Sequence, residues 1–211
     1  MQQQYGSEQQ NLGQNIPQFN RGGHEIFEAN EIIQCTINLL DNYTIYRPFV
    51  KDQELMGILD RQAAYIRTQY NLTVECFKSG LKPSQETEPY LIPQMKQPVY
   101  GIQPQSQPKK PAASQAEIND AAISTLMLNI VKPHASALAR SATEVVNPVL
   151  RRVLASQSQN FVEMAYELFE YQNVRGYYQL PQLPGQDMHA MLNGFAPSMG
   201  GNQGMGMGQA H

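Results

Sequence analysis

The chain has 211 residues, of which 16% are charged, with a formal net charge of −3 and a sequence pI near 5.8. A nucleic-acid binder needs a basic face to displace counterions, so this balance excludes that class and we expect no nucleic-acid partner. No apolar run reaches the roughly 18 residues of a membrane span, and the glutamine-rich N-terminus lacks the basic and apolar segments of a signal peptide, so we expect neither membrane insertion nor export.

The two ends of the chain, residues 1–23 and 184–211, are rich in glutamine, asparagine, glycine and methionine. Neither end has the apolar periodicity that could bury a core. We therefore predict disordered tails on both sides of the folded part.

Residues 24–80 predict a first helical hairpin. One helix is expected from His24 to Tyr46 and is interrupted by Pro48, and a second begins after Asp52, which can act as its N-cap, and ends at Gly80. The apolar face of the first helix is predicted at Ile26, Ile33, Ile37 and Leu40. The second helix shows a near-heptad seam of Leu55, Leu59, Ala63, Ile66, Tyr70, Val74 and Phe77.

Residues 81–113 form a crossover in which seven prolines exclude a helix. At about 3.1 Å per residue, this extended segment is longer than a helix of roughly 45 Å, so it can connect opposite ends of a bundle. Its apolar part, Tyr90 to Ile102, is expected to lie against the helices.

Residues 114–183 predict a second hairpin. Ser114 and Glu117 have the spacing of a capping box for the third helix, and Pro133 predicts a kink inside it. Asn147 and Pro148 begin the fourth helix, whose buried stripe is predicted at Leu150, Leu154, Phe161, Met164, Leu168 and Tyr171. The opposite face, expected in water, holds Arg152, Gln159, Glu163, Glu170 and Gln172.

Two hairpins joined by one long crossover predict an all-α, ferritin-like four-helix bundle. The dinuclear metal site of such bundles needs a Glu-x-x-His motif on each of two helices, and the sequence has none. We therefore expect no catalytic residue, no cofactor and no metal ligand set.

The sequence also contains three weaker pairings of reactive side chains. Folding the second hairpin brings His134 level with Glu163, and the first hairpin brings His24 with Glu25 and Glu28 loosely near Cys76, but both sets have too few or too scattered ligands for a metal site. Cys35 and Cys76 are expected roughly 22 Å apart in the folded hairpin, which excludes an intramolecular disulfide and leaves an intermolecular one open.

The helix start NPVLRRVL, the block EMAYELFEYQN and the following GYYQLPQL resemble the spore coat protein F family, whose coat F domain is ferritin-like. The first half, HEIFEANEIIQCTINLLDNY through DQELMGILDRQ, is similar to the helical hairpin that accompanies this domain in longer members. The resemblance implies a structural, non-catalytic protein of the endospore coat, made in the mother-cell cytoplasm. Its implied partners are other spore coat proteins, with a possible homo-oligomer.

By analogy with coat crosslinking, Tyr177 and Tyr178 could form dityrosine, and Lys109 and Lys110 could be transglutaminase substrates. The competing interpretation is that the two tyrosines simply pack the end of the helix. Two other functions stay open at this point: a ferritin-like oxidoreductase with a remodelled metal site, and a cytosolic adaptor whose segment Gln103 to Pro111 docks a partner as polyproline II.

Overall fold

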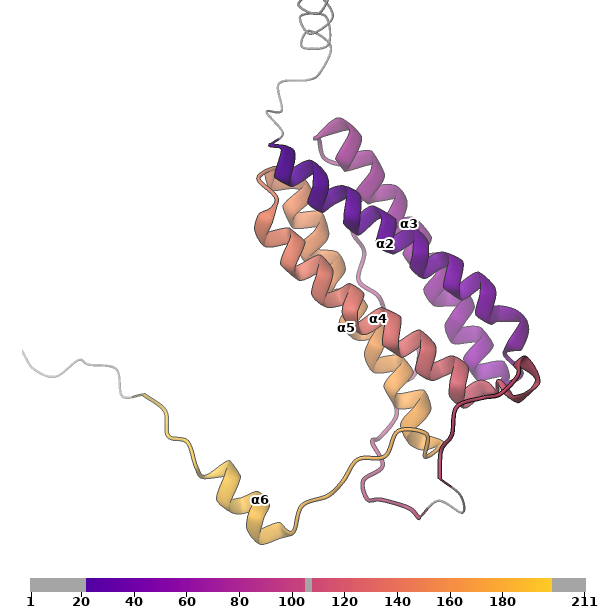
Figure 1. Cartoon of the computed structure of the whole chain (residues 1–211). Coiled ribbons are helices and arrows are strands. Elements are labelled where there is room, and N and C mark those ends of the chain that lie inside the picture. The colour runs from indigo at the N-terminus through magenta and orange to yellow at the C-terminus, as the bar shows by residue number, and fades with distance from the viewer. Residues whose placement is uncertain (1–21, 105–107, 199–211) are drawn as a thin grey trace, which may run out of the picture.

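The computed structural model describes residues 22–104 and 108–198, and regular structure in these residues is entirely helical. Residues 1–21 and 199–211 of the predicted tails lie outside these ranges, as do residues 105–107 of the proposed docking segment. Four long helices form the bundle in Figure 1: α2 (Gly23–Tyr46), α3 (Gln53–Ser79), α4 (Asp120–Glu144) and α5 (Pro148–Val174). The shorter elements are η1 (Arg47–Phe49), η2 (Gln115–Glu117) and α6 (Gly185–Leu192). None of the described helices combines the length and apolarity needed to cross a bilayer.

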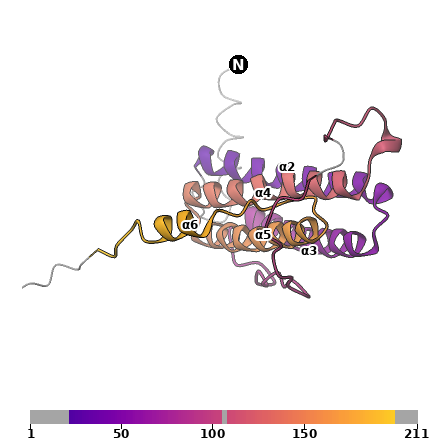
Figure 2. The ribbon, with the colours of Figure 1, turned by 90° about the horizontal axis from the view of Figure 1, so that it is seen from below.

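The four helices pack in the cyclic order α2, α3, α5, α4, so that each helix contacts two neighbours. Viewed from below, α2 and α4 form one layer and α3 and α5 the other (Figure 2). The carboxylate of Asp120, at the start of α4, accepts the backbone N–H of Lys51, whereas Asn147, at the start of α5, donates to the carbonyl of Gly80 at the opposite end. The crossover therefore spans the bundle, which confirms the predicted fold class.

The helix starts follow their capping residues. Asp52 accepts the N–H groups of the first turn of α3, and Asn147 accepts those of α5, as predicted. The prediction for the third helix was wrong: Ser114 makes no capping bond, because residues 115–117 form a short 3₁₀ turn and Ile118 is extended. The side chain of Asn119 caps α4 instead, by accepting the N–H of Ala122 at 3.0 Å. α4 then continues through Pro133.

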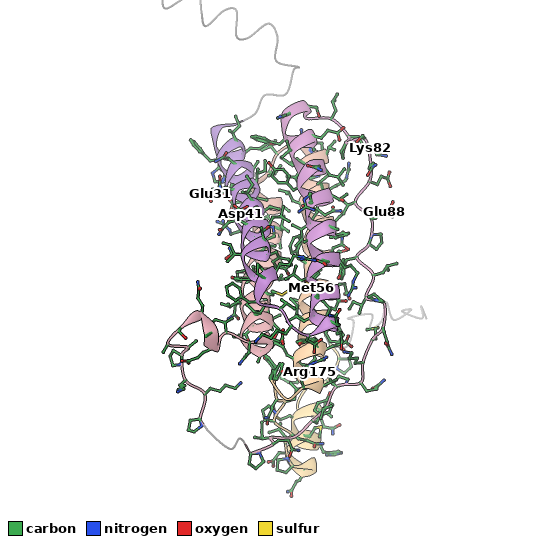
Figure 3. The ribbon with its side chains drawn as sticks, turned by 90° about the vertical axis from the view of Figure 1, so that its right-hand side faces the viewer. Glu31, Asp41, Met56, Lys82, Glu88 and Arg175 are labelled. Atoms are coloured by element: carbon green, nitrogen blue, oxygen red, sulfur yellow. The ribbon has the colours of Figure 1, made fainter. Side chains whose placement is uncertain are left out.

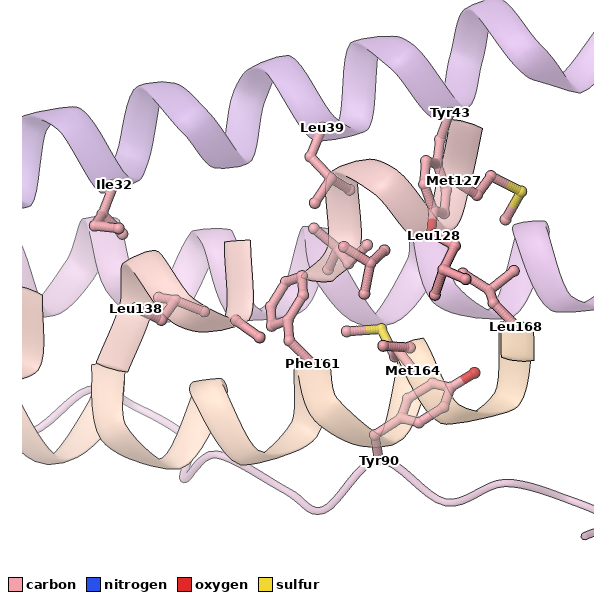
Figure 4. Packing of buried hydrophobic residues seen from close by; sticks show 14 of the residues in the cluster. Ile32, Leu39, Tyr43, Tyr90, Met127, Leu128, Leu138, Phe161, Met164 and Leu168 are labelled. Carbon is pink, nitrogen blue, oxygen red and sulfur yellow. The ribbon is translucent and has the colours of Figure 1, made fainter. Parts of the chain in front are cut away.

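The predicted stripe of α5 forms the centre of the core, and all six of its residues are at most 2% exposed. Figure 4 shows Phe161, Met164 and Leu168 of this stripe facing Leu39 and Tyr43 of α2 and the residues of α4. Fully burying side chains of this size stabilises a fold by about 1.5–3 kcal/mol each. The apolar spacing of α5 therefore predicted the main packing surface.

The predicted faces of the first hairpin need correction. In α2 the buried side chains are Glu25, Glu28, Ala29, Ile32, Thr36, Leu39 and Tyr43, while Ile26 is exposed. In α3 the seam follows Leu55, Leu59, Gln62, Ile66, Gln69, Thr73 and Cys76, so it passes through polar residues where the sequence favoured apolar ones. The physical reason is that Gln62 and Thr73 bond side chains of α5 inside the bundle, and the backbone carbonyl of Gln69 accepts from Gln157 of α5.

The segment predicted as the C-terminal tail, residues 184–211, contains α6, which was not expected. All residues of α6 are exposed, and Figure 1 shows it standing away from the four long helices. This helix therefore adds no buried surface to the core.

Candidate functional site

The first part of the crossover runs along the bundle from Lys82 past Glu88 toward the end that holds Arg175 (Figure 3). Side chains of α5 bind its backbone. The N–H groups of Tyr90, Lys96 and Val99 donate to Asn160 Oδ1 (2.9 Å), Glu170 Oε1 (2.8 Å) and Asn173 Oδ1 (2.6 Å), respectively. A proline-rich segment has few backbone partners of its own, and buried N–H groups need acceptors. α5 supplies those acceptors.

This arrangement corrects the predicted solvent face of α5. Glu170 and Gln172, which were expected in water, are only 3% and 2% exposed, and Glu170 accepts the backbone N–H of Lys96 in the crossover. α5 is consequently buried on two sides, by the core on one side and by the crossover on the other. Beyond Val99, Gly101 has φ +101°, and its N–H donates to the carbonyl of Leu180 at 2.8 Å, so the crossover also pairs with the segment that follows α5.

A buried polar network joins three helices to the crossover at Glu167. The Tyr90 hydroxyl donates to Glu167 Oε2 at 2.5 Å, Gln62 Nε2 donates to the same oxygen at 3.0 Å, and the Arg61 guanidinium pairs with Oε1. Tyr43, from α2, donates to Gln62 Oε1 at 2.6 Å. One carboxylate therefore ties α2, α3, α5 and the crossover together.

In this network the hydroxyls of Tyr90 and Tyr43 are neutral, and the carboxylate of Glu167 is paired with Arg61. Burial, followed by the hydrogen bond to Glu167, raises the pKa of Tyr90 above its ordinary range, and burial raises that of Tyr43. Both hydroxyls therefore keep their protons and act as donors near neutral pH. The network contains a single carboxylate, Glu167, and its hydrogen-bonded partners give it a structural role: it fixes Tyr90 and with it the crossover.

A second polar cluster closes the end of the bundle. Arg175 donates to Asp52 Oδ2 (2.9 Å) and Glu54 Oε2 (2.9 Å), and its guanidinium lies 4.0 Å from the ring centroid of Tyr171. Lys96 of the crossover also pairs with Glu54. The same N-cap carboxylate that begins α3 thus holds the C-terminus of α5.

Three of the four residues proposed for crosslinking lie around one groove. Lys109, Lys110 and Tyr177 line a groove of about 600 Å³ beside the first turn of α4, and Lys109 Nζ donates to the carbonyl of Tyr177 at 3.1 Å. Tyr178 lies apart from them: its ring packs edge-on against Phe169 at 5.4 Å and it is 39% exposed. Tyr177 is partly buried against the core.

The structure gives His134 partners other than Glu163, which is exposed. The Thr36 hydroxyl donates its proton to the carbonyl of Ile32 at 2.8 Å, so it accepts from His134 Nε2 at 3.2 Å. The imidazole ring also packs on Phe161, with centroids 4.6 Å apart, and burial lowers the pKa of His134 to about 4. His134 is thus a neutral core residue at pH 7.

The structure also revises the surroundings of His24. Its Nε2 lies 2.6 Å from Glu144 Oε2 of α4, and Glu28 lies close to both, whereas Cys76 is not part of this group. The carboxylate of Glu25 accepts the N–H of Asn147. Both cysteines are free thiols; Cys35 is exposed and Cys76 is buried.

Sequence reasoning missed Asn160, Glu167 and Asn173, the residues that bind the crossover. A signal for two of them was available: asparagine is a poor helix former, so a buried asparagine inside a long helix indicates a side-chain role. Glu167 and Asn173 also lie three residues on either side of Glu170, which places the three on adjoining turns of one helix face.

The comparisons with known proteins agree on one family. The family model for the coat F domain matches residues 119–181. The chain is 51% identical over 191 residues to the spore coat protein F-like protein YhcQ of Bacillus subtilis (strain 168), which covers 89% of this chain and 87% of that protein. The chain belongs to the spore coat protein F family.

A solved structure of low sequence identity shares the fold. A crystal structure of a candidate spore coat protein from Bacillus halodurans C-125 covers 81% of this chain and 99% of its own, with a TM-score of 0.57 at 14% identity. The coat F match covers α4, α5 and the residues that follow α5 as far as position 181, including Leu180, which pairs with the crossover. Helix α5, which binds the backbone of the crossover, therefore lies inside the matched family domain.

Proposed function

We propose that this protein is a structural component of the bacterial endospore coat that assembles with other coat proteins by surface packing and has no catalytic activity. Membership of the spore coat protein F family, with 51% identity to a coat F-like relative, supports the location. The closed Glu167 network supports a structural role, because its carboxylate is held by a guanidinium, a phenol and an amide. Synthesis in the mother-cell cytoplasm is part of the same proposal.

The proposed packing rests mainly on the exposed apolar side chains of the crossover. While α5 binds its backbone from within, four large apolar side chains point outward and are at least 50% exposed: Leu91, Met95, Val99 and Ile102. Several large exposed apolar side chains along one ordered segment make that segment the candidate interaction surface of the monomer. Because Asn160, Glu170 and Asn173 hold the backbone, this surface is ordered before a partner arrives, which lowers the entropy lost on binding.

The test replaces Leu91, Met95 and Ile102 by serine in one variant. These side chains do not hold the fold, so the variant should unfold at the wild-type temperature. Its amount in purified spore coats should fall several-fold relative to wild type, measured by immunoblot after decoating. A matched control changes Ile45, Val146 and Val162, which are exposed on or between the helices, to serine.

Equal incorporation of the crossover variant and wild type would contradict the proposed surface. An equal loss in the control variant would also contradict it, because the effect would then depend on general apolarity rather than on the crossover.

The crosslinking proposal applies first to Tyr178 and Lys110, because both are exposed. It applies less to Tyr177 and Lys109, because Lys109 Nζ already donates to the carbonyl of Tyr177. Peptide mass spectrometry of isolated coats should find Tyr178 or Lys110 in crosslinked peptides. Finding all four residues only in unmodified form would remove this proposal while leaving noncovalent packing intact.

A further inference from the structure

The first turn of α2 and the last residue of α4 bring three metal-ligating side chains together. His24 and Glu28 are four residues apart on one face of α2, and Glu144 ends α4, its antiparallel neighbour. One ligand atom from each lies within 4.8 Å of the other two, and His24 Nε2 is 2.6 Å from Glu144 Oε2. This group is at the end of the bundle, far along α5 from Glu167.

The ligand types distinguish among cations. One imidazole nitrogen with two carboxylates suits Zn²⁺, whereas Mg²⁺ and Ca²⁺ prefer oxygen ligands alone. Bond lengths of about 2.0–2.1 Å in a tetrahedral zinc site place ligand atoms roughly 3.3 Å apart. The side chain of His24 is 69% exposed and that of Glu144 is 31% exposed, so both can rotate by the small amount that this spacing requires.

The charge at Glu28 is a second and independent observation. Glu28 is only 8% exposed, yet the nearest cationic nitrogen, Arg140 Nη2, is 3.7 Å from its Oε2, beyond hydrogen-bond length. The other contact to that oxygen is the Ser141 hydroxyl, which donates at 2.9 Å but carries no charge. A buried carboxylate without a hydrogen-bonded cation is costly. Glu25, also buried, adds a further negative charge at this end.

We propose that His24, Glu28 and Glu144 bind one zinc ion, with water in the fourth position. The ion would neutralise Glu28 and join the start of α2 to the end of α4. The site would therefore brace the first turn of α2 against α4. This inference is independent of the coat role.

The experiment is titration calorimetry of the purified full chain with zinc chloride, after removal of metal by EDTA and dialysis. Wild type should bind one zinc ion in this site. His24→Ala and Glu144→Gln should each weaken zinc affinity at least tenfold. Both side chains lie outside the hydrophobic core, so the variants should keep the wild-type helical circular dichroism. The matched control is His189→Ala on the exposed helix α6, which should keep the wild-type affinity.

A second measurement separates this site from zinc bound elsewhere. Zinc should raise the melting temperature of wild type and of His189→Ala, but should leave that of His24→Ala unchanged. The proposal is overturned if wild type binds no zinc, or if His24→Ala binds it as tightly as wild type does.

Discussion

Asn173 pairs in both directions with the backbone of Val99: Val99 N–H donates to Asn173 Oδ1 at 2.6 Å, and Asn173 Nδ2 donates to the Val99 carbonyl at 3.0 Å. The side-chain amide thus takes the place that a neighbouring strand would have in a sheet. It lets a helix side chain bind the backbone of an extended segment on both its N–H and its carbonyl side. The crossover is therefore part of the folded structure of the bundle and its outer face is presented in a fixed orientation.

Removing this amide should release the crossover locally. Asn173→Ala is expected to lower the free energy of unfolding by about 2 kcal/mol, because a buried hydrogen-bonded pair is lost and the Val99 N–H is left without its acceptor. Hydrogen exchange should become faster at Val99 and its neighbours and stay unchanged in α2. Gln159→Ala, an exposed change on the same helix, should shift stability by less than about 0.5 kcal/mol. Unchanged exchange at Val99 would count against the role of Asn173.

Glu167 should be the most sensitive polar position. Glu167→Leu removes the acceptor of the Tyr90 hydroxyl, one of the two acceptors of Gln62 Nε2 and the counter-ion of Arg61, so we expect a loss of about 3 kcal/mol in urea unfolding. Glu163→Leu, on the exposed face of the same helix, is the matched control and should be nearly neutral. Equal effects of the two substitutions would refute the network as the link between helices and crossover.

The buried polar residues of α3 should stabilise the fold through their hydrogen bonds. Gln62 is fully buried and bonds Tyr43, Met164 and Glu167, so Gln62→Leu, although more apolar, should destabilise the fold by about 2–3 kcal/mol. Ala63→Leu, one residue along and outside this seam, should cost much less. Thermal unfolding followed by circular dichroism measures both; a stabilised Gln62→Leu variant would show that the seam does not depend on its hydrogen bonds.

Acidification should destabilise the protein through His134. Burial lowers its folded pKa to about 4, against an ordinary value of about 6.5, so the unfolded chain binds the proton first as pH falls. Stability from this residue is complete above pH 6.5 and is lost as pH falls to 4. Since each pKa unit corresponds to about 1.4 kcal/mol, the total loss is about 3 kcal/mol.

The control for this prediction is His134→Gln, which cannot titrate. Its unfolding free energy, measured in urea at several pH values between 7 and 4, should fall less steeply than that of wild type. Parallel pH profiles for the two proteins would refute the assignment of the pH dependence to His134.

The sequence predicted this fold best where apolar spacing alone decides packing. The stripe of α5, from Leu150 to Tyr171, and the caps at Asp52 and Asn147 needed only local rules. It failed where buried positions are polar. A hydrophobic pattern does not identify Gln62, Gln69 and Thr73 as core residues. The side chains of Gln62 and Thr73 and the backbone carbonyl of Gln69 bond residues of α5 that are about 85 to 105 positions away in the sequence.

Dependence on distant partners also explains why the contacts between the crossover and α5 were not predicted from the sequence. The crossover was expected to lie against the bundle, but nothing in its own residues indicated which helix would accept its N–H groups. Glu170 and Gln172 are typical of a solvated helix face when α5 is considered alone. Only the packed structure shows that Glu170 and Gln172 are buried, with Glu170 bonded to the crossover backbone, while Gln159 and Glu163 of the same predicted face stay exposed. The unpredicted face of α2 has a similar cause, since Glu25 and Glu28 are buried by contacts with Asn147 and Ser141.

The most direct test of the coat assignment is the position of a fluorescently tagged copy in sporulating cells of the source bacterium. The account predicts a shell of fluorescence around the forespore that stays with the mature spore, and a weaker shell for the variant in which Leu91, Met95 and Ile102 are serine. Diffuse fluorescence in the mother cell throughout sporulation would contradict the proposed function.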